Sequence, residues 1–146
     1  VMLGYLRADN PGVIEAPPDG WYDTGDIVEV DEHRFVTILG RAKRFSKIAG
    51  EMVSLTAVET KLQEAFPGEN FAVVAIPDEK KGEQLILFTT IANPERAAIS
   101  EGLTSRGASD LMVPKVLVHL DEIPLLGSGK TDYVTLTRIS LEGANA

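Results

Sequence analysis

The sequence predicts an α+β fold in which helices flank a three-stranded sheet and a stretch of β-strands comes first. The first 39 residues contain short apolar runs separated by turn residues, which is typical of β-structure. From Ser54 onward the apolar residues recur either at helical spacing or in strand-like runs. The resulting order is helix, strand, strand, helix, strand, helix, which indicates a small domain with helices packed on a sheet.

The composition of the 146-residue chain excludes several classes of site. No cysteine is present, which excludes thiolate zinc sites, thiol nucleophiles and disulfides, and two histidines are too few for a histidine metal cluster. A net charge of −8 argues against general binding to nucleic-acid phosphates. No apolar run approaches the roughly 20 residues that a membrane helix needs. Because the first residues resemble the interior of a strand, we expect a fragment of a longer protein.

The N-terminal region is expected to be β-structure. A short strand is predicted at residues 1–7, and a stretch with three prolines and two glycines follows at 8–20. Residues 26–40 hold two apolar strands around a polar turn at 31–33, which is a hairpin signature that Gly40 closes.

A helix is predicted after Ser54, because four apolar residues recur at helical spacing and a Pro67-Gly68 pair ends the pattern. Thr56 and Glu59 fit a capping box at the start of this helix. The four apolar residues are Leu55, Val58, Leu62 and Phe66.

Three strands and two more helices follow. The runs at 71–77 and 84–92 are nearly continuously apolar, so both are expected inside a covered sheet. Asn93 is expected to cap the second helix, with Pro94 in its first turn. The remaining predicted elements are a strand at 115–123 and a closing helix at 131–141, capped by Thr131 or Asp132.

The stretch PLLGSGK at 124–130 combines glycines with a lysine, as nucleotide-binding loops do. A P-loop needs glycine at position 124, where Pro124 instead removes a backbone N–H and fixes φ. A P-loop also follows an early strand, whereas this stretch lies near the end of the chain. Lys130 is therefore either an ordinary turn lysine or a lysine that a pliable loop carries into a site formed elsewhere.

Four basic residues and no acid occur within RAKRFSK, residues 41–47. On an acidic protein, such a cluster is where an anionic partner would be attracted. The alternative is a solvated face that has no partner. The four residues are Arg41, Lys43, Arg44 and Lys47.

Three stretches, in a fixed order, resemble the motifs of one enzyme family. They are GWYDTGD (20–26), GRAKRFSKIAGEMVSLTAVE (40–59) and PLLGSGK (124–130). Together they resemble the C-terminal motifs of adenylate-forming enzymes, which include acyl-CoA synthetases, luciferases and peptide-synthetase adenylation domains. The residues of the three stretches are most similar to those of one branch of the family. Its members are bifunctional bacterial enzymes that charge acyl carrier protein with fatty acid and reacylate 2-acylglycerophosphoethanolamine.

The resemblance implies two half-reactions and a division of the chain. Fatty acid and ATP would give acyl-adenylate, with Mg²⁺ held mainly by an upstream domain and the phosphates; the phosphopantetheine thiol of acyl carrier protein would then displace AMP. Residues 1–40 would be the β-rich tail of a large N-terminal adenylation domain. Residues 41–53 would form a hinge and a β-hairpin, and 54–146 a mobile C-terminal lid domain that rotates between the two steps.

The resemblance also assigns the residues of the adenylation step. Lys130 matches the lysine that bridges the fatty carboxylate and the α-phosphate. At ~4 Å and an effective dielectric near 20, one lysine contributes about 4 kcal/mol, so its loss would cost on the order of a thousandfold in rate. Asp26 matches the aspartate that holds the ribose hydroxyls, with a turn cap as the alternative. Arg41 is expected near ribose or phosphate, or else in a surface ion pair.

The thioester step would use a second set of residues. Lys43 falls at the family's hinge position. Lys47 and Gly50 are expected beside the pantetheine channel, where a glycine allows close backbone approach, although a bulge in a strand pair would equally require one. Arg44, together with Lys43, is expected to contact acyl carrier protein.

Two functions remain open for the chain. It is either a fragment of the ligase that is inactive alone, or a non-catalytic module that binds acyl carrier protein. Glu51-Met52 replaces an aromatic-arginine pair common in CoA enzymes, which favours a carrier protein over CoA. Neither His33 nor His119 begins the His-x-x-x-x-Asp motif of a lysophospholipid acyltransferase, so that activity would lie elsewhere in the full-length protein. We expect the full-length protein at the cytoplasmic face of the bacterial inner membrane.

Overall fold

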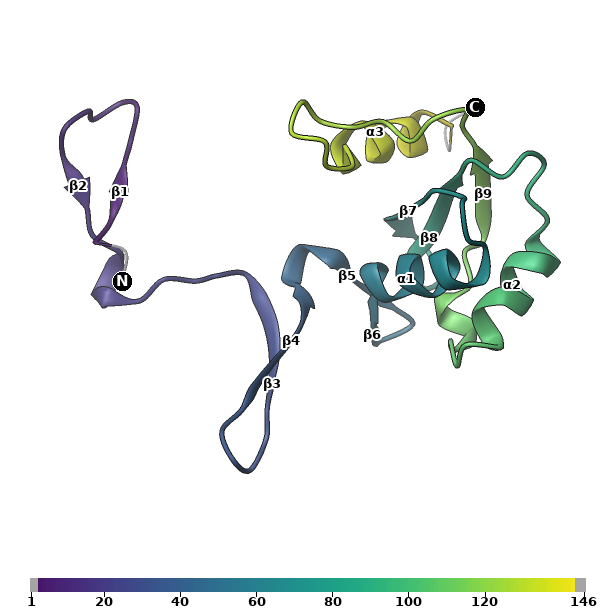
Figure 1. Ribbon diagram of the computed structural model, residues 1–146, viewed down its shortest axis with the longest axis horizontal. Helices are drawn as coiled ribbons and strands as arrows, with labels where there is room; N and C mark the ends of the chain where they lie inside the picture. The colour runs from purple at the N-terminus through teal and green to yellow at the C-terminus, as the bar shows by residue number, and fades with distance from the viewer. Residues whose placement is uncertain (1–2, 144–146) are drawn as a thin grey trace. The chain divides into compact units, whose positions relative to one another are not determined.

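The computed structural model describes residues 3–143, which belong to two compact units (Figure 1). Unit 1 is Val1–Ala42 and unit 2 is Lys43–Ala146. Each unit is described by itself below.

Unit 1 consists of two antiparallel hairpins. Strand β1 (Tyr5–Leu6) pairs with β2 (Ile14–Glu15), and a 3₁₀ turn, η1 (Pro18–Gly20), follows. Strand β3 (Asp26–Val30) pairs with β4 (Val36–Arg41), as the sequence predicts. The predicted first strand is shorter than expected within the described residues, and β2 is an addition inside the stretch that was expected to contain only turns.

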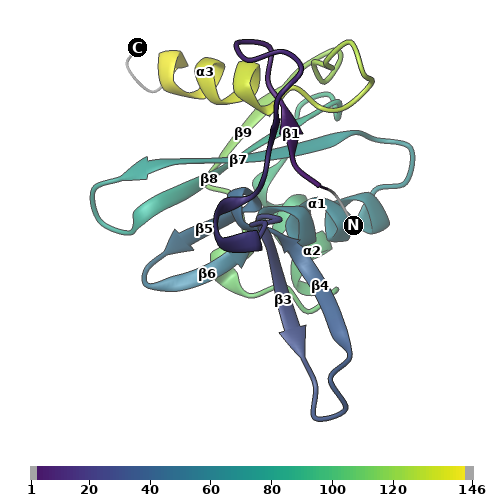
Figure 2. The ribbon, with the colours of Figure 1, turned by 90° about the vertical axis from the view of Figure 1, so that its left-hand side faces the viewer.

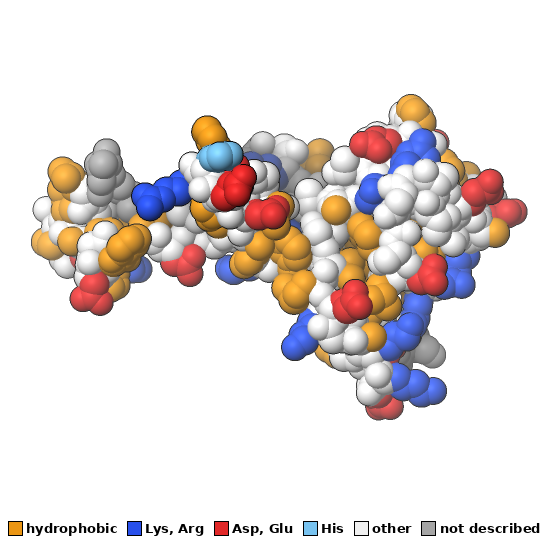
Figure 3. Space-filling view, turned by 90° about the horizontal axis from the view of Figure 1, so that it is seen from below, with side chains coloured by type: hydrophobic (Ala, Val, Ile, Leu, Met, Phe, Trp, Pro, Cys, Tyr) orange, Lys and Arg blue, Asp and Glu red, His pale blue; other side chains and the backbone are white. Residues whose placement is uncertain are grey.

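The apolar side chains of unit 1 lie at its surface. Its described residues include no buried hydrophobic side chain, and Trp21 is 83% exposed. Both strands of the β3–β4 hairpin expose aliphatic residues on their two faces, among them Val30 and Ile38. Hydrophobic side chains are accordingly visible at the left of Figure 3. The two hairpins are therefore held by backbone pairing and not by a core of their own.

Unit 2 has the element order that the sequence predicts after residue 53, preceded by a further hairpin. A 3₁₀ turn, η2 (Ala42–Arg44), leads into that hairpin. The elements that follow are β5 (Phe45–Ile48), β6 (Glu51–Ser54), α1 (Leu55–Ala65), β7 (Phe71–Asp78), β8 (Gly82–Thr89), α2 (Arg96–Thr104), η3 (Asp110–Met112), β9 (Val116–His119) and α3 (Tyr133–Gly143).

The three-stranded sheet has the order β7-β8-β9, with β7 antiparallel and β9 parallel to β8. Helices α1 and α2 pack on one face of the sheet, where Leu62 and Leu103 are fully buried. Helix α3 covers the other face through Leu136, which contacts the cluster around Phe88. Figure 2 shows α3 on the opposite side of the sheet from α1 and α2. The predicted α+β fold with a three-stranded sheet and flanking helices is confirmed.

The helix starts differ from two of the predictions. Ser54 caps α1, because its hydroxyl accepts the Ala57 N–H at 3.2 Å. The predicted capping box of Thr56 and Glu59 is wrong, since both residues lie inside the helix. The carboxylate of Glu59 is instead used in contacts with neighbouring elements, described below.

The predicted cap of α2 is also wrong. The helix begins at Arg96, and Asn93 precedes it with a φ of 54°. Asn93 tolerates this left-handed conformation because its short polar side chain can bond locally, so it serves the turn and not the helix. At α3 the prediction is confirmed for Asp132, whose carboxylate accepts the Thr135 N–H at 3.0 Å. Among residues 3–143, no helix is long and apolar enough to cross a membrane.

Candidate functional site

Lys130 lies at the end of a tight, hydrogen-bonded loop between β9 and α3. Residues Leu125 and Thr131 form an isolated antiparallel bridge across the loop. The Leu126 N–H donates to the Lys130 carbonyl at 2.7 Å, and the Asp132 N–H donates to the Pro124 carbonyl at 2.8 Å. The glycine-containing stretch is therefore a closed turn with a defined base, and not an open phosphate cradle.

The side chain of Lys130 is exposed, and it makes no ion pair or hydrogen bond with the described residues. The positive φ of Gly129, 80°, allows the chain to turn just before the lysine. No acidic partner among the described residues would have to be displaced before a ligand contacts this ammonium. This placement fits a lysine that acts on a substrate bound by another part of the protein.

Asp26 and Arg41 form one site in unit 1. The two residues face each other in the β3–β4 register, and Arg41 Nη1 lies 2.9 Å from Asp26 Oδ1. The same nitrogen donates to the Thr24 carbonyl at 2.7 Å. The Asp26 side chain is only 17% exposed, whereas that of Arg41 is 66% exposed. The structure thus brings together the two residues that were predicted to bind the nucleotide, in a strand pair that fixes their spacing.

Lys47 and Gly50 lie on the β5–β6 hairpin of unit 2. Gly50 occupies the two-residue turn with a φ of 92°, next to Ala49 at 52°. The alternative of a bulge is therefore wrong: Gly50 is needed because this kind of hairpin turn places both central residues at positive φ. A Cβ built at Gly50 meets no atom within 4 Å, so the backbone conformation and not the space selects glycine.

Glu83 holds this hairpin on the sheet, a role that the sequence analysis missed. Its Oε2 accepts the Lys47 N–H at 2.6 Å and the Ser46 hydroxyl at 2.9 Å. The Ala49 N–H also donates to the Lys81 carbonyl at 2.8 Å. With its backbone fixed at two points, the hairpin presents the exposed Lys47 side chain from a rigid support. No sequence signal marks Glu83, because its partners are more than 30 residues away in the chain.

The two neighbours of the basic cluster in unit 2, a lysine and an arginine, differ in exposure. Lys43 is exposed in η2 where the two units meet in sequence, whereas the Arg44 side chain is only 16% exposed. Arg44 Nη2 lies 2.7 Å from Glu59 Oε1. The expected contact between Arg44 and a carrier protein is poorly compatible with this geometry, because the charge is turned inward and already paired. The predicted hinge at Lys43 stays a prediction.

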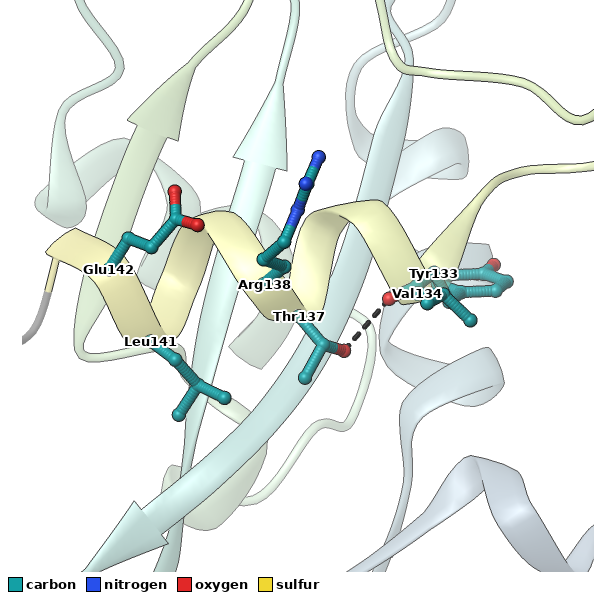
Figure 4. A pocket seen from close by; sticks show the side chains of 6 residues that line it. All are labelled: Tyr133, Val134, Thr137, Arg138, Leu141 and Glu142. Carbon is teal, nitrogen blue, oxygen red and sulfur yellow. Dashed lines mark hydrogen bonds between the residues drawn. The ribbon is translucent and has the colours of Figure 1, made fainter.

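An open hollow lies elsewhere, along the outer face of α3. Its volume is about 550 Å³, and none of the predicted site residues lines it (Figure 4). Its lining residues are Tyr133, Val134, Thr137, Arg138, Leu141 and Glu142. Within residues 3–143, no group of three or more His, Asp or Glu side chains could hold a metal ion.

The chain is similar in sequence to ligases that act through AMP. Triostin synthetase I of Streptomyces triostinicus is 33% identical over 145 residues, which cover 98% of this chain and 28% of that protein. The 2,3-dihydroxybenzoate-AMP ligase of Bacillus subtilis (strain 168) is 30% identical over 137 residues, 92% of this chain and 25% of that protein. The chain therefore spans about a quarter of the length of these relatives. No family model matches it.

Solved structures give the same result. ATP-bound MatB from Rhodopseudomonas palustris superposes with a TM-score of 0.69 at 27% identity, covering 86% of this chain and 25% of that one. A fatty acyl CoA synthetase of Mycobacterium tuberculosis superposes with a TM-score of 0.62 at 29% identity, covering 81% of this chain and 24% of that one.

Proposed function

Because the chain corresponds to the C-terminal part of an AMP-forming, adenylate-forming enzyme of the acyl-CoA synthetase type, we propose that it works in a two-step ligase. In the first step, a carboxylate oxygen attacks the α-phosphorus of ATP, which forms an acyl-adenylate and releases pyrophosphate. In the second step, a thiol attacks the acyl carbon, which forms a thioester and releases AMP while the thiol proton passes to solvent. Mg²⁺ would lower the charge of the phosphates, and it would be held mainly by those phosphates and by an upstream domain.

Lys130 acts in the first step, and the observation that carries the proposal is its exposed, unpaired ammonium at the end of a closed loop. When the carboxylate attacks, negative charge gathers between the incoming oxygen and the α-phosphate. A lysine ~4 Å away at an effective dielectric near 20 stabilises that charge by about 4 kcal/mol. Its role is electrostatic and requires no proton transfer.

Asp26 and Arg41 bind the nucleotide in this proposal. The two oxygens of a carboxylate can accept both hydroxyls of a ribose, and the 2.9 Å contact with Arg41 fixes the orientation of the Asp26 carboxylate. The 66% exposed Arg41 side chain retains further N–H donors for a ribose or phosphate oxygen.

Lys47 and Gly50 act in the second step. Their hairpin is a separate part of unit 2 from the loop that precedes α3, as Figures 1 and 2 both show. A rotation of unit 2 about Lys43 would therefore replace the Lys130 loop by the β5–β6 hairpin at a single active site. A pantetheine arm would pass beside this exposed turn, as the resemblance implies.

The acyl substrate and its acceptor are proposed as a fatty acid and acyl carrier protein. Glu51-Met52 stands where CoA enzymes commonly have an aromatic-arginine pair, which favours a carrier protein over CoA. The exposed lysines Lys43 and Lys47 would attract either acceptor, because both are anionic. We further propose that the full-length protein also acylates a lysophospholipid at the cytoplasmic face of the inner membrane, through a domain outside this chain. Both proposals rest on the amino-acid sequences of the three motifs.

The test compares Lys130→Ala with Lys80→Ala in the full-length enzyme. Lys80 is an exposed lysine of the β7–β8 turn and has no assigned role, so it controls for the loss of one positive charge. Lys130→Ala should lower pyrophosphate exchange with ATP and fatty acid on the order of a thousandfold. Transfer from preformed acyl-adenylate should stay within about twofold of wild type. Undiminished exchange in Lys130→Ala would refute the proposal.

A second candidate function is a non-catalytic module that binds acyl carrier protein through Lys43 and Lys47. A titration with the carrier distinguishes little by itself, because weaker binding in salt or in Lys47→Glu fits both functions. The half-reactions decide: only a ligase loses adenylation in Lys130→Ala while it keeps transfer. The 146-residue chain alone should make no acyl-adenylate.

A further inference from the structure

The outer edge of β7 is closed by two charged side chains from other elements. β7 is an edge strand, and Val73 points its backbone N–H and carbonyl away from β8. The Val73 N–H donates to Glu59 Oε1 at 2.7 Å, and the Val73 carbonyl accepts from Arg44 Nη1 at 3.0 Å. The 3₁₀ turn η2, through Arg44, and the helix α1, through Glu59, are thus tied to one residue of the sheet.

Tyr133 completes this cluster from the far end of the chain. Its hydroxyl lies 3.2 Å from both carboxylate oxygens of Glu59, and its ring lies 3.9 Å below the Arg44 guanidinium carbon. Arg44 Nη2 has no aligned hydrogen-bond acceptor, so its 2.7 Å contact with Glu59 is ionic and leaves the ring face as its other neighbour. Burial, with the Glu59 charge, raises the pKa of Tyr133, so the hydroxyl stays protonated and donates.

Tyr133 is the first residue of α3, three positions after Lys130. Between them, Thr131 bridges to Leu125 and the Asp132 N–H donates to Pro124. The base of the lysine loop therefore adjoins Tyr133 in the chain. Tyr133 is held by Glu59 and by Arg44, the residue that follows the predicted hinge. A short path of contacts joins the hinge region to the lysine.

We propose that Arg44, Glu59 and Tyr133 are positioning residues that hold the Lys130 loop in a fixed relation to the strand after the hinge. The inference rests on the proposed function of Lys130. A lysine on a loose loop would have to be ordered in each turnover, and a displacement of about 1 Å can cost on the order of a hundredfold in rate. With the cluster formed, rotation of unit 2 delivers the lysine as part of a rigid body.

A purely structural role makes a different prediction. If the three residues only protect the β7 edge, their loss lowers stability and affects both half-reactions together. If they position Lys130, their loss lowers adenylation and spares thioester formation, because the β5–β6 hairpin is held separately, through Glu83 and the Lys81 carbonyl.

The experiment uses Tyr133→Phe, which removes one hydroxyl and keeps the ring over Arg44, in the full-length enzyme. Glu59→Gln is the second variant, which keeps the shape and removes the charge. Arg106→Lys is the matched control, since Arg106 also binds backbone carbonyls, of Gly102 and Glu64, and contacts neither the loop nor Tyr133.

Tyr133→Phe and Glu59→Gln should lower pyrophosphate exchange by roughly tenfold and leave transfer from preformed acyl-adenylate within about twofold. Arg106→Lys should lower the melting temperature without changing the ratio of the two rates. In the 146-residue chain, the amides of Leu126, Gly129 and Asp132 should exchange hydrogen faster in Tyr133→Phe than in wild type or Arg106→Lys.

Lys130→Ala, measured in the same series, distinguishes failure of the proposed function from failure of the positioning role. If Lys130→Ala keeps full adenylation, the proposed function is refuted. If Lys130→Ala loses adenylation but Tyr133→Phe and Glu59→Gln leave the ratio of half-reactions unchanged, only the positioning role is overturned, whatever the amide exchange shows.

Discussion

The two units of the chain use their apolar residues in opposite ways. Unit 1 holds fourteen of the twenty large hydrophobic side chains that are exposed in the described residues, and it buries none. Unit 2 buries seventeen hydrophobic residues on the two faces of one sheet. At roughly 25 cal/mol per Å² of apolar surface, burial on this scale is what stabilises a fold, so unit 2 has a source of stability that unit 1 lacks.

The difference shows what each unit needs from the rest of a protein. An exposed hairpin with apolar residues on both strands is stable only when another surface covers it. That unit 1 belongs to a larger domain, which would supply such a surface, stays a prediction. Unit 2 carries its own core and is suited to move as a body.

The largest expected effect comes from equal truncations in the two units. Phe88→Ala removes a fully buried ring from unit 2 and should lower the free energy of unfolding by about 3–5 kcal/mol. Phe35→Ala removes a ring that is 71% exposed in unit 1 and should change the free energy of unfolding by less than about 0.5 kcal/mol. Urea unfolding of the 146-residue chain, followed by circular dichroism, measures both. Similar losses would show that unit 1 contributes to the cooperative core.

A smaller effect is expected from backbone strain at matched glycines. Gly50 and Gly25 have φ values of 92° and 68°, and a Cβ at either meets open space. Gly50→Ala should therefore lower the stability of unit 2 by about 1–2 kcal/mol through strain alone. Gly25→Ala places the same strain in unit 1 and should leave the main urea transition unchanged. A shift of that transition by Gly25→Ala would contradict the division into two units.

The loss of a helix cap should cost less again. Ser54→Ala removes the hydroxyl that accepts the Ala57 N–H at the start of α1 and should destabilise unit 2 by about 1 kcal/mol. Thr24→Ala removes a comparable hydroxyl, 3.3 Å from the Asp26 N–H in unit 1, and should not alter the midpoint. Equal midpoints for Ser54→Ala and wild type would mean that the Ser54 contact contributes nothing.

The smallest effect is a dependence on pH. The Thr135 backbone N–H holds the pKa of Asp132 below its ordinary 3.8, so this carboxylate stabilises unit 2 above that pH and the contribution is lost as the pH falls through the lower, folded-state value. The midpoint difference between wild type and Asp132→Ala should therefore be larger near about pH 6 than near about pH 3. Asp31→Ala, in the β3–β4 turn, should show no such change. A constant difference for Asp132→Ala would refute the assignment.

The order of elements in unit 2 was predictable because each strand is a long apolar run that the sheet covers. The helix starts were less predictable, since Thr56 and Ser54 are both acceptable caps and only the register of β6 selects Ser54. The parallel direction of β9 was not predicted either, because a four-residue strand has no pattern that specifies its neighbour.

The candidate site was predictable where a motif is local and less so where contacts are distant. The pairing of Asp26 with Arg41 follows from one hairpin, whose two strands bring the residues face to face. The inward turn of Arg44 did not follow from the sequence, because its acceptor on Val73 lies 29 residues away. Within the run of basic residues at 41–47, nothing in the sequence distinguishes the inward-facing Arg44 from its exposed neighbours.

The parallel pairing of β9 with β8 also affects the order of folding. The β7–β8 hairpin depends on contacts that are local in sequence, so we expect it early. β9 can join only after residues 90–115 have closed a loop around α2, which delays it. On the ribosome, Lys130 emerges after β9, so we expect the nascent chain to complete the sheet before the lysine reaches its final place.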